Sequence, residues 1–278
     1  MADGSPKRPL MRYHGGKWRL APWIISYFPE HRAYVEPFGG GGSVLIRKER
    51  SYAEVYNDLD GEVVNLFRVT RERGDELREL LRLTPFARAE FESAWQPSSD
   101  ELEQARRTVI RSFMGFGSAA VSLEVGGKPK TGFRANSNRS GTTPAHDWAN
   151  YPDCMAALIE RLQGVVIENR DAMKCMAHHD TEETLHYVDP PYVASTRDKG
   201  GDYRHEMTDA DHRELAAFLR TLKGMVVLSG YHSELYDELY ADWSRTERVA
   251  FADGAMKRTE VLWFNRGFGN VEQERLFA

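Results

Sequence analysis

The sequence predicts an α/β protein whose sheet is mostly parallel, with an antiparallel final strand and a mostly helical insertion. Short apolar strands alternate with helical segments near the N-terminus and again after residue 155, and between them apolar residues recur at helical spacing. A chain of 278 residues can bury one large core together with a smaller inserted domain. We therefore expect a discontinuous core domain of residues 1–62 and 155–278, with residues 63–154 inserted.

The first unit begins with a short strand at 34–36, which runs into a glycine-rich loop at 37–43. Residues 44–48 begin a helix, and a second strand at 54–57 leads to the acid Asp58. A strand, a glycine loop, a helix and a strand with a terminal acid are typical of the Rossmann-like nucleotide-binding unit.

The middle of the chain changes character. Residues 62–112 carry apolar side chains at helical spacing among Arg and Glu, as in Val63, Val64 and Phe67. From residue 113 to residue 151 the composition shifts toward Gly, Ser, Asn, Thr and basic residues. This stretch predicts a mostly helical domain that carries a long polar region.

The α/β pattern then resumes. Three further strands are expected at 165–168, 185–188 and 225–229. Thr208 and Asp211 form a capping-box start for a helix that is expected to stop at Gly224. The chain closes with an antiparallel pair of strands, 248–251 with 260–265.

The strand at 185–188 ends on Asp189, Pro190, Pro191 and Tyr192. The prolines stiffen the turn because they fix φ and lack an N–H donor. A carboxylate and a backbone carbonyl then converge beside an aromatic ring, an arrangement suited to a planar group with an exocyclic amine, such as a nucleobase. The alternative is a strand followed by a proline-stiffened loop.

The glycine loop allows backbone N–H groups to approach a ligand closely. A strict dinucleotide motif would need a third glycine where Val44 stands, which argues against a nicotinamide cofactor. Glu36 would repel a pyrophosphate and would tolerate a ligand with a sulfonium and an α-amino group. The alternative is a tight turn without a ligand.

Two further acids have open interpretations. Asp58 could bind ribose hydroxyls, or it could be a simple turn acid, with Asp60 as a neighbouring candidate. Asp171, after the strand at 165–168, could meet an adenine amine or cap a helix.

Net charge is −5 at pH 7, yet basic residues concentrate in one segment, where the only acid is Glu124. Such confinement is expected of a surface that contacts phosphates. The basic residues of this segment are Arg106, Arg107, Arg111, Lys128, Lys130, Arg134 and Arg139.

The sequence contains no apolar run long enough to span a membrane and no apolar stretch like that of a signal peptide, so we expect a cytoplasmic protein. Cys154 and Cys175 lack metal-site spacing. Residues 178–180, His-His-Asp, are interpreted as a solvated loop, and no metal is expected.

The order of the motifs resembles the Dam-like DNA adenine methyltransferases over nearly the whole chain, with the middle as the least matched part. The later segments Ser229-Gly230-Tyr231 and Arg258-Thr259-Glu260 share the resemblance. The motifs that carry it are Tyr13-x-Gly15-Gly16-Lys17, Glu36-Pro37-Phe38-Gly39-Gly40-Gly41-Gly42-Ser43, Asn57-Asp58, a basic insertion and Asp189-Pro190-Pro191-Tyr192.

The resemblance implies methyl transfer from S-adenosylmethionine to the 6-amino group of an adenine flipped out of double-stranded DNA. It implies a target site in Asp189, Pro190, Pro191 and Tyr192, with Tyr192 replacing lost base stacking, and the basic segment on DNA. The cofactor-binding residues that it implies are Tyr13, Gly15, Gly16, Lys17, Glu36, Pro37, Phe38, Gly39, Gly41, Ser43, Asn57, Asp58, Asp171 and Asp189.

A cognate restriction endonuclease is a further expected partner, and the expected setting is the cytoplasm of a bacterial or phage-infected cell. Two alternatives stay open. One is a methyltransferase for another amine, in cytosine, an RNA base or a protein amide; the other is a non-catalytic DNA-binding protein on the same scaffold.

Overall fold

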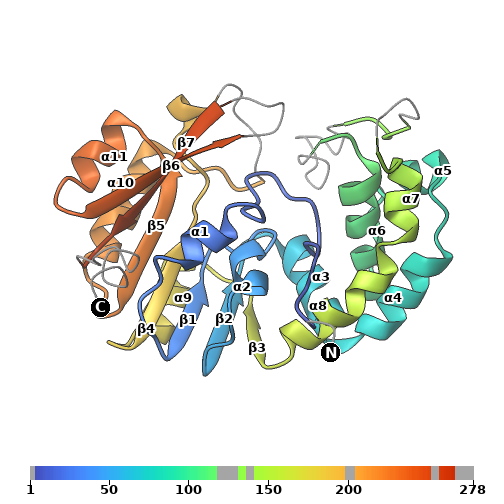
Figure 1. Cartoon of the computed structure of the whole chain (residues 1–278), viewed down its shortest axis with the longest axis horizontal. Coiled ribbons are helices and arrows are strands. Elements are labelled where there is room, and N and C mark those ends of the chain that lie inside the picture. Colours follow the sequence, from blue (N-terminus) through green and yellow to red (C-terminus); the bar gives the residue numbers. More distant parts are fainter. Residues whose placement is uncertain (1–3, 118–130, 136–140, 198–203, 252–256, 267–278) are drawn as a thin grey trace.

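The computed structural model describes residues 4–117, 131–135, 141–197, 204–251 and 257–266. Within these ranges the strands form one seven-stranded sheet in the order β3-β2-β1-β4-β5-β7-β6 (Figure 1). The strands are β1 (Ala33–Glu36), β2 (Ala53–Asn57), β3 (Val165–Glu168), β4 (Thr184–Val188), β5 (Met225–Tyr231), β6 (Ser244–Phe251) and β7 (Lys257–Phe264).

The first five strands pair in parallel, and β7 lies antiparallel between β5 and β6. The predicted mixed sheet is therefore confirmed, and its last pair is longer than the sequence pattern indicated. The strand order reverses at the centre, because β1 has β2 on one side and β4 on the other. Ligands of open α/β sheets bind outside the carboxyl ends of the strands at such a point. Here the loop after Glu36 and the motif at Asp189 meet.

Alternate residues of the strands enter two different cores. Tyr34, Leu185 and Val227 belong to the core that includes residues of α1 (Ala21–Ile25) and α2 (Ser43–Arg47). Val188, Val226 and Leu228 pack in the other, with residues of α9 (Ala172–His179), α10 (Asp209–Leu219) and α11 (Glu234–Leu239). Both faces of the sheet are covered, as expected for parallel strands that are apolar throughout.

The helices between β2 and β3 gather on one side of the molecule (Figure 1). They are α3 (Gly61–Glu72), α4 (Gly74–Leu83), α5 (Arg88–Ser93), α6 (Glu101–Met114), α7 (Pro144–Ala149) and α8 (Met155–Leu162). Asp60 caps α3 and Asp100 caps α6 through backbone N–H groups of the first turn. Phe67, Leu77 and Leu158 share one continuous core with the sheet, so the helices are anchored to it.

Two local predictions need correction. The capping box of Thr208 and Asp211 begins α10 as expected, but the helix ends at Leu219 and not at Gly224. Residues 178–180 are not a loop: α9 ends at His179, and Asp180 accepts hydrogen bonds from the N–H groups of Lys223 and Gly224.

Among the helices of the described ranges, none is long and apolar enough to cross a membrane.

Candidate active site

Two adjoining cavities open at the carboxyl ends of β1, β2 and β4. The larger has a volume of about 290 Å³, and the smaller, of about 40 Å³, lies against the glycine loop. Tyr13, Phe38, Gly40 and Asp189 line both, so the two form one recess. Asp189 stands where they meet.

Asp189 is held through one of its two carboxylate oxygens. Ser229 Oγ donates to Asp189 Oδ1 at 2.7 Å, and Lys17 Nζ lies 3.1 Å from the same oxygen. Tyr187 and Ser229 join their hydroxyls at 3.1 Å, which supports the serine from beneath. Among the described residues no hydrogen bond to Oδ2 is found, and the side chain is 17% exposed. The carboxylate is thus fixed in orientation while one oxygen stays available to a ligand.

Lys17 lies deeper than a surface lysine, with 6% of its side chain exposed. Its ammonium donates to the Gly15 carbonyl at 2.8 Å and lies 3.6 Å from Glu260 Oε1. It also sits over the ring of Tyr192, 4.6 Å from the ring centroid. The N-terminal loop therefore supplies a cation beneath the Asp-Pro-Pro-Tyr motif.

Tyr192 does not have the position that stacking on a base would require. Its side chain is 5% exposed, and its hydroxyl donates to Glu260. Lys17 covers the ring, and Tyr231 meets it edge-on at 4.6 Å. Pro191 lines the larger cavity instead, while Pro190 is buried. The predicted stacking role is therefore not supported by this arrangement.

Three aromatic rings pack closely against the glycine loop. A Cβ on Gly39 would come 2.2 Å from the Tyr56 ring, and one on Gly40 would come 2.7 Å from the Tyr13 ring. Gly42 has φ +58°, and a Cβ there would lie 2.7 Å from Phe67. Packing alone therefore requires glycine at these positions, whether or not a ligand binds. Gly41, Gly15, Gly16 and Ser43 line the smaller cavity, as predicted for residues near a ligand.

Glu36 is a buried carboxyl at the wall of the smaller cavity, 3% exposed. Its Oε2 accepts hydrogen bonds from Tyr34 Oη at 2.7 Å and from the N–H of Leu45 at 2.9 Å. Burial, with a contribution from the charge of Asp189, raises the pKa of Glu36 to about 8. A cation placed beside Glu36 would stabilise its carboxylate form and lower this raised pKa.

Asp58 lies at the wall of the larger cavity and holds the glycine loop. Its two oxygens accept from the N–H of Gly40 at 2.7 Å and from that of Asp60 at 2.8 Å. Burial raises the pKa of Asp58 to about 6, although both hydrogen bonds oppose the shift. Asp171 lines the same cavity and caps α9 through the N–H of Lys174, so the helix-cap interpretation is confirmed and contact with an adenine amine stays a prediction.

Asn57, predicted on the cofactor, is fully buried and lines neither cavity. Its side-chain amide donates to the carbonyls of Pro37 and Arg170 and accepts from the N–H of Arg170. Asn57 thus ties the loop after β1 to the loop after β3. This finding corrects the predicted role: it shapes the recess and does not face it.

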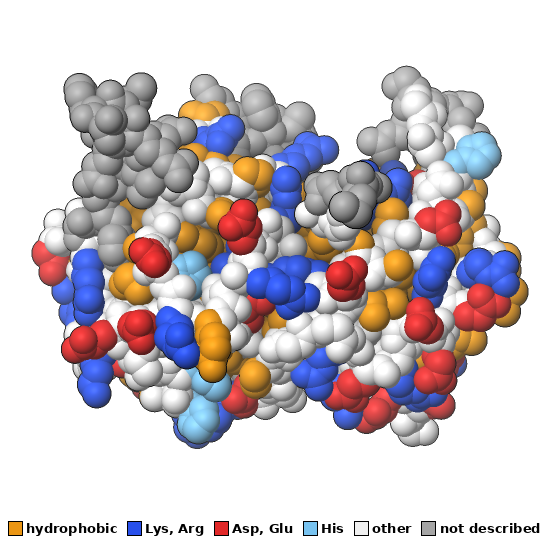
Figure 2. Space-filling view, turned by 60° about the horizontal axis from the view of Figure 1, so that its bottom comes forward, with side chains coloured by type: hydrophobic (Ala, Val, Ile, Leu, Met, Phe, Trp, Pro, Cys, Tyr) orange, Lys and Arg blue, Asp and Glu red, His pale blue; other side chains and the backbone are white. Residues whose placement is uncertain are grey.

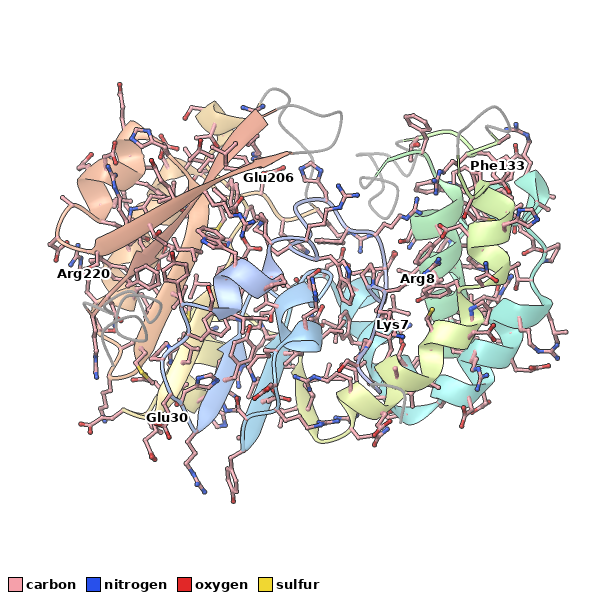
Figure 3. The ribbon with its side chains drawn as sticks, viewed as in Figure 1. Lys7, Arg8, Glu30, Phe133, Glu206 and Arg220 are labelled. Carbon is pink, nitrogen blue, oxygen red and sulfur yellow. The ribbon has the colours of Figure 1, made fainter. Side chains whose placement is uncertain are left out.

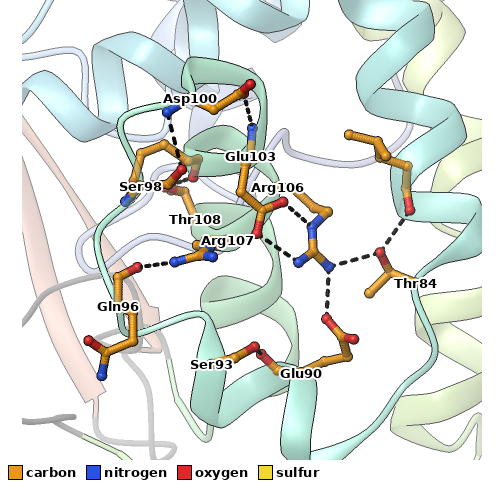
Figure 4. A network of polar contacts seen from close by, with 12 residues as sticks. Thr84, Glu90, Ser93, Gln96, Ser98, Asp100, Glu103, Arg106, Arg107 and Thr108 are labelled. Carbon is orange, nitrogen blue, oxygen red and sulfur yellow. Dashed lines mark hydrogen bonds and ion pairs between the residues drawn. The ribbon is translucent and has the colours of Figure 1, made fainter.

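Three of the predicted DNA-contacting arginines pair with carboxylates inside the helical part, and Figure 4 shows two of them, Arg106 and Arg107. Arg106 binds Glu103 at 2.7 Å and Glu90 at 2.8 Å, and Arg107 binds Glu103 at 2.6 Å. Arg111 is 1% exposed and pairs with Glu62 of α3. These arginines connect helices, and the structure favours a structural role for them over contact with DNA.

The other predicted basic residues lie elsewhere. Arg134 is half-buried and follows Phe133, which Figure 3 shows at the top of the helical part. Lys128, Lys130 and Arg139 lie outside the described residues. On the face shown in Figure 2, acidic and basic side chains are interspersed over the helical half, as the pairing of Arg106 and Arg107 leads one to expect.

Sequence reasoning missed several residues of the recess. Arg204, Glu206 and Met207 line the larger cavity, and Figure 3 labels Glu206 near the centre of the molecule. Arg204 binds Asp60 at 2.9 Å and Glu62 at 3.1 Å, which ties this segment to α3. Glu260 belongs to the segment Arg258-Thr259-Glu260 that shares the resemblance, but nothing in that segment predicts its contacts with Lys17 and Tyr192. No local pattern marks these residues, because their position depends on folding.

The chain is similar to known adenine-specific DNA methyltransferases. The family of D12 class N6 adenine-specific DNA methyltransferases matches residues 13–252. The chain is 28% identical over 262 residues to the type II methyltransferase M1.LlaDCHI of Lactococcus lactis subsp. cremoris, covering 85% of this chain and 86% of that protein. It is 24% identical over 244 residues to the DNA adenine methylase of Haemophilus influenzae, covering 84% and 82%.

The family description specifies both the base and the nucleic acid, namely adenine in DNA. It therefore sets aside the alternatives of another amine substrate and of a non-catalytic DNA-binding protein. The resemblance inferred from the order of motifs is confirmed over most of the chain. This chain belongs to the D12 class N6 adenine-specific DNA methyltransferases.

Proposed function

We propose that the enzyme takes its methyl group from S-adenosylmethionine and places it on an adenine held against Asp189. The observation that carries this proposal is the position of Asp189 at the junction of two cavities, anchored through Oδ1 alone among the described residues. One oxygen is fixed and the other faces a recess that is open to a ligand.

The recess suits S-adenosylmethionine in charge and shape. When bound, this cofactor supplies a methyl group on a sulfonium, beside a cationic α-amino group. Acidic side chains of the recess include Glu36, Asp58 and Asp171, while Phe38 and Met173 add apolar surface. The residues proposed to hold the cofactor are Tyr13, Gly15, Gly16, Lys17, Glu36, Pro37, Phe38, Gly39, Gly41, Ser43, Asp58, Asp171 and Asp189.

Each end of the recess has a distinct task in this proposal. Glu36, with its raised pKa, attracts the ammonium of the methionine part, because a cation stabilises its carboxylate form. Asp58 binds ribose hydroxyls with the acceptor capacity that its two backbone hydrogen bonds leave. Asp171 receives the adenine amine of the cofactor.

Asp189 and the Pro190 carbonyl accept the two hydrogens of the target amine. That amine is a poor nucleophile because its lone pair is delocalised into the ring. Two acceptors placed on its hydrogens favour a pyramidal nitrogen and free the lone pair for attack on the methyl group. As the N–C bond forms, the methyl–sulfur bond would break and leave a neutral thioether, and the proton that the nitrogen then releases would pass to Asp189 or to solvent. Positioning and fixed acceptors supply most of the rate.

The target adenine reaches Asp189 only after it leaves the base stack, because a stacked base cannot enter a recess. Residues 63–154 remain our proposed target-recognition domain. Within it we propose Arg134, Lys128, Lys130 and Arg139 as DNA contacts, since Arg106, Arg107 and Arg111 already pair with carboxylates.

We further propose a restriction–modification setting in the cytoplasm of a bacterial or phage-infected cell, with a cognate endonuclease as partner. The support is that one relative is named a type II methyltransferase. Sequencing that maps methylated adenines in DNA from expressing cells will identify the target sequence. Endonucleases that cut this sequence should then fail on the modified DNA, and unhindered cutting would contradict this setting.

Transfer of tritium from labelled cofactor to unmethylated duplex DNA tests the mechanism. We expect Asp189→Ala to lower kcat by about a thousandfold or more, because the carboxylate acts on the reacting amine. The matched control is Asp153→Ala, an exposed acid of the short 3-10 turn Pro152–Cys154. Undiminished transfer by Asp189→Ala would remove this carboxylate from the mechanism.

A further inference from the structure

We propose that Glu260 is a positioning residue for the methyl transfer, which acts by holding Lys17 and Tyr192 beneath Asp189. This inference rests on the proposed role of Asp189. Glu260 lies on β7 and lines neither cavity, so it acts only through its neighbours.

The geometry places one ammonium between two carboxylates. Lys17 Nζ lies 3.1 Å from Asp189 Oδ1 and 3.6 Å from Glu260 Oε1. The hydroxyl of Tyr192 donates to the same oxygen of Glu260. These contacts join the N-terminal loop, the motif after β4 and strand β7, three segments far apart in the sequence.

A buried carboxylate at this position destabilises the fold unless its contacts offset the loss of hydration. Glu260 is 3% exposed, and the next residues of the strand, Val261 and Leu262, are buried in the core. Burying a charged group costs several kcal/mol unless it is paired and hydrogen-bonded, and an apolar residue would stabilise the strand more simply. The two groups that compensate Glu260 both belong to the motifs of the active site.

The second anion changes what Lys17 does to Asp189. The ammonium pairs with Asp189 Oδ1 at 3.1 Å, and Glu260 at 3.6 Å is a second anion that shares it. Glu260 therefore keeps Lys17 in place and draws part of its charge away from Asp189, which leaves Asp189 a better acceptor for the target amine than it would be as the sole partner of Lys17. The Tyr192 hydroxyl fixes Glu260 itself, which gives this tyrosine a function other than stacking.

The test is Glu260→Gln in the full-length enzyme, assayed with labelled S-adenosylmethionine and adenine-unmethylated genomic DNA. We expect kcat at saturating cofactor to fall by about tenfold or more, while KM for DNA changes by less than about twofold. Because Lys17 also belongs to the proposed cofactor pocket, the calorimetric Kd for cofactor is expected to rise, but by a smaller factor than kcat falls. A purely structural role would lower Tm and raise Kd by as much as kcat falls. Glu247→Gln, an exposed acid on the neighbouring strand β6, is the matched control and should behave as wild type.

The conservative variant Glu260→Asp keeps the charge but shortens the side chain, so its kcat should lie between those of wild type and Glu260→Gln. If Glu260→Gln does not fold, this variant alone is decisive. Wild-type kcat in either folded variant would overturn the inference, as would a loss of cofactor affinity as large as the loss in kcat. Absence of methyl transfer by the wild-type enzyme would instead contradict the proposed function, so the two failures are distinguishable.

Discussion

The active-site edge of the sheet and the helical part both contain many carboxylates, yet they shift the pKa of these groups in opposite directions. At the active site, burial raises the pKa of Glu36 to about 8 and that of Asp58 to about 6, and it also raises the pKa of Glu260. In the helical part, Arg106 lowers the pKa of Glu103 to about 2.

The two regions use charged side chains differently: one pairs them within the protein, and the other leaves acids in excess beside a cavity. Around α6 each guanidinium already has a carboxylate partner, and such pairs connect helices. At the recess the acids outnumber the cations Lys17, Arg170 and Arg204, and a cationic ligand would reduce this excess of negative charge. Raised carboxyl pKa values next to a cavity therefore indicate a binding site, while lowered values within paired clusters indicate structure.

The largest effect on stability is expected from Gly42→Ala in the active-site loop. The substitution forces a Cβ into a left-handed conformation at φ +58° and to within 2.7 Å of Phe67. We expect a loss of about 2–4 kcal/mol in the free energy of unfolding, together with weaker cofactor binding. Chemical denaturation measures the first and calorimetry the second. Gly132→Ala, with no atom within 4 Å of its Cβ, is the control.

A smaller effect should follow from Arg106→Ala in the helical part. This side chain is 15% exposed and bridges Glu103 to Glu90, so its removal leaves Glu90 without this partner. We expect a loss of about 1–3 kcal/mol in unfolding free energy, and no change in the salt dependence of DNA binding. Arg82→Ala removes an exposed pair with Glu79 and should leave Tm unchanged. A reduced salt slope for Arg106→Ala would restore its predicted contact with phosphate.

The smallest effect concerns the pH dependence of cofactor binding. With a pKa of about 8, Glu36 is mostly protonated at pH 7 in the free protein, and a bound ammonium would favour its carboxylate form. Affinity for S-adenosylmethionine should therefore rise by about tenfold between pH 6.5 and 8 and then level off. In Glu36→Gln this rise should disappear, leaving only the titration of the ligand itself. Calorimetry across that range would refute the idea if both proteins gave the same profile.

The same shift has a consequence for the free protein. The folded state binds a proton at Glu36 more tightly than the unfolded chain does, because its folded pKa of about 8 exceeds the ordinary value of 4.5. The stabilising contribution is complete below the ordinary value and is lost as pH rises through about 8. Glu36→Gln should remove this part of the pH dependence of Tm.

The positions of the acids at the strand ends could be predicted, because the sequence patterns that mark them are local. The alternation in the strands, the glycine loop and the acids at strand ends appear within a few residues of each other, and parallel strands bring their carboxyl ends together. Hence Glu36, Asp58, Asp171 and Asp189 were expected at one edge, and all four line the recess.

Three predicted site residues occupy positions that the sequence pattern did not indicate, and the physical cause is the same in each case. Asn57 follows the same strand-end rule, but its amide points between two loops instead of into the recess. Arg111 belongs to a basic segment, yet the packing of α6 on α3 buries it against Glu62. Tyr192 lies close in sequence to Asp189, the proposed acceptor of the target amine, yet Lys17 and Glu260 contact its ring and hydroxyl.

By itself, the amino-acid sequence determined the class of fold, the family and the set of acids at the strand ends, because spacing and residue type encode each of these locally. Only the tertiary structure decided which charges face the recess and which are neutralised inside the protein. Those outcomes depend on partners that are distant in sequence, as Glu260 is from Lys17, and on burial that no short segment contains.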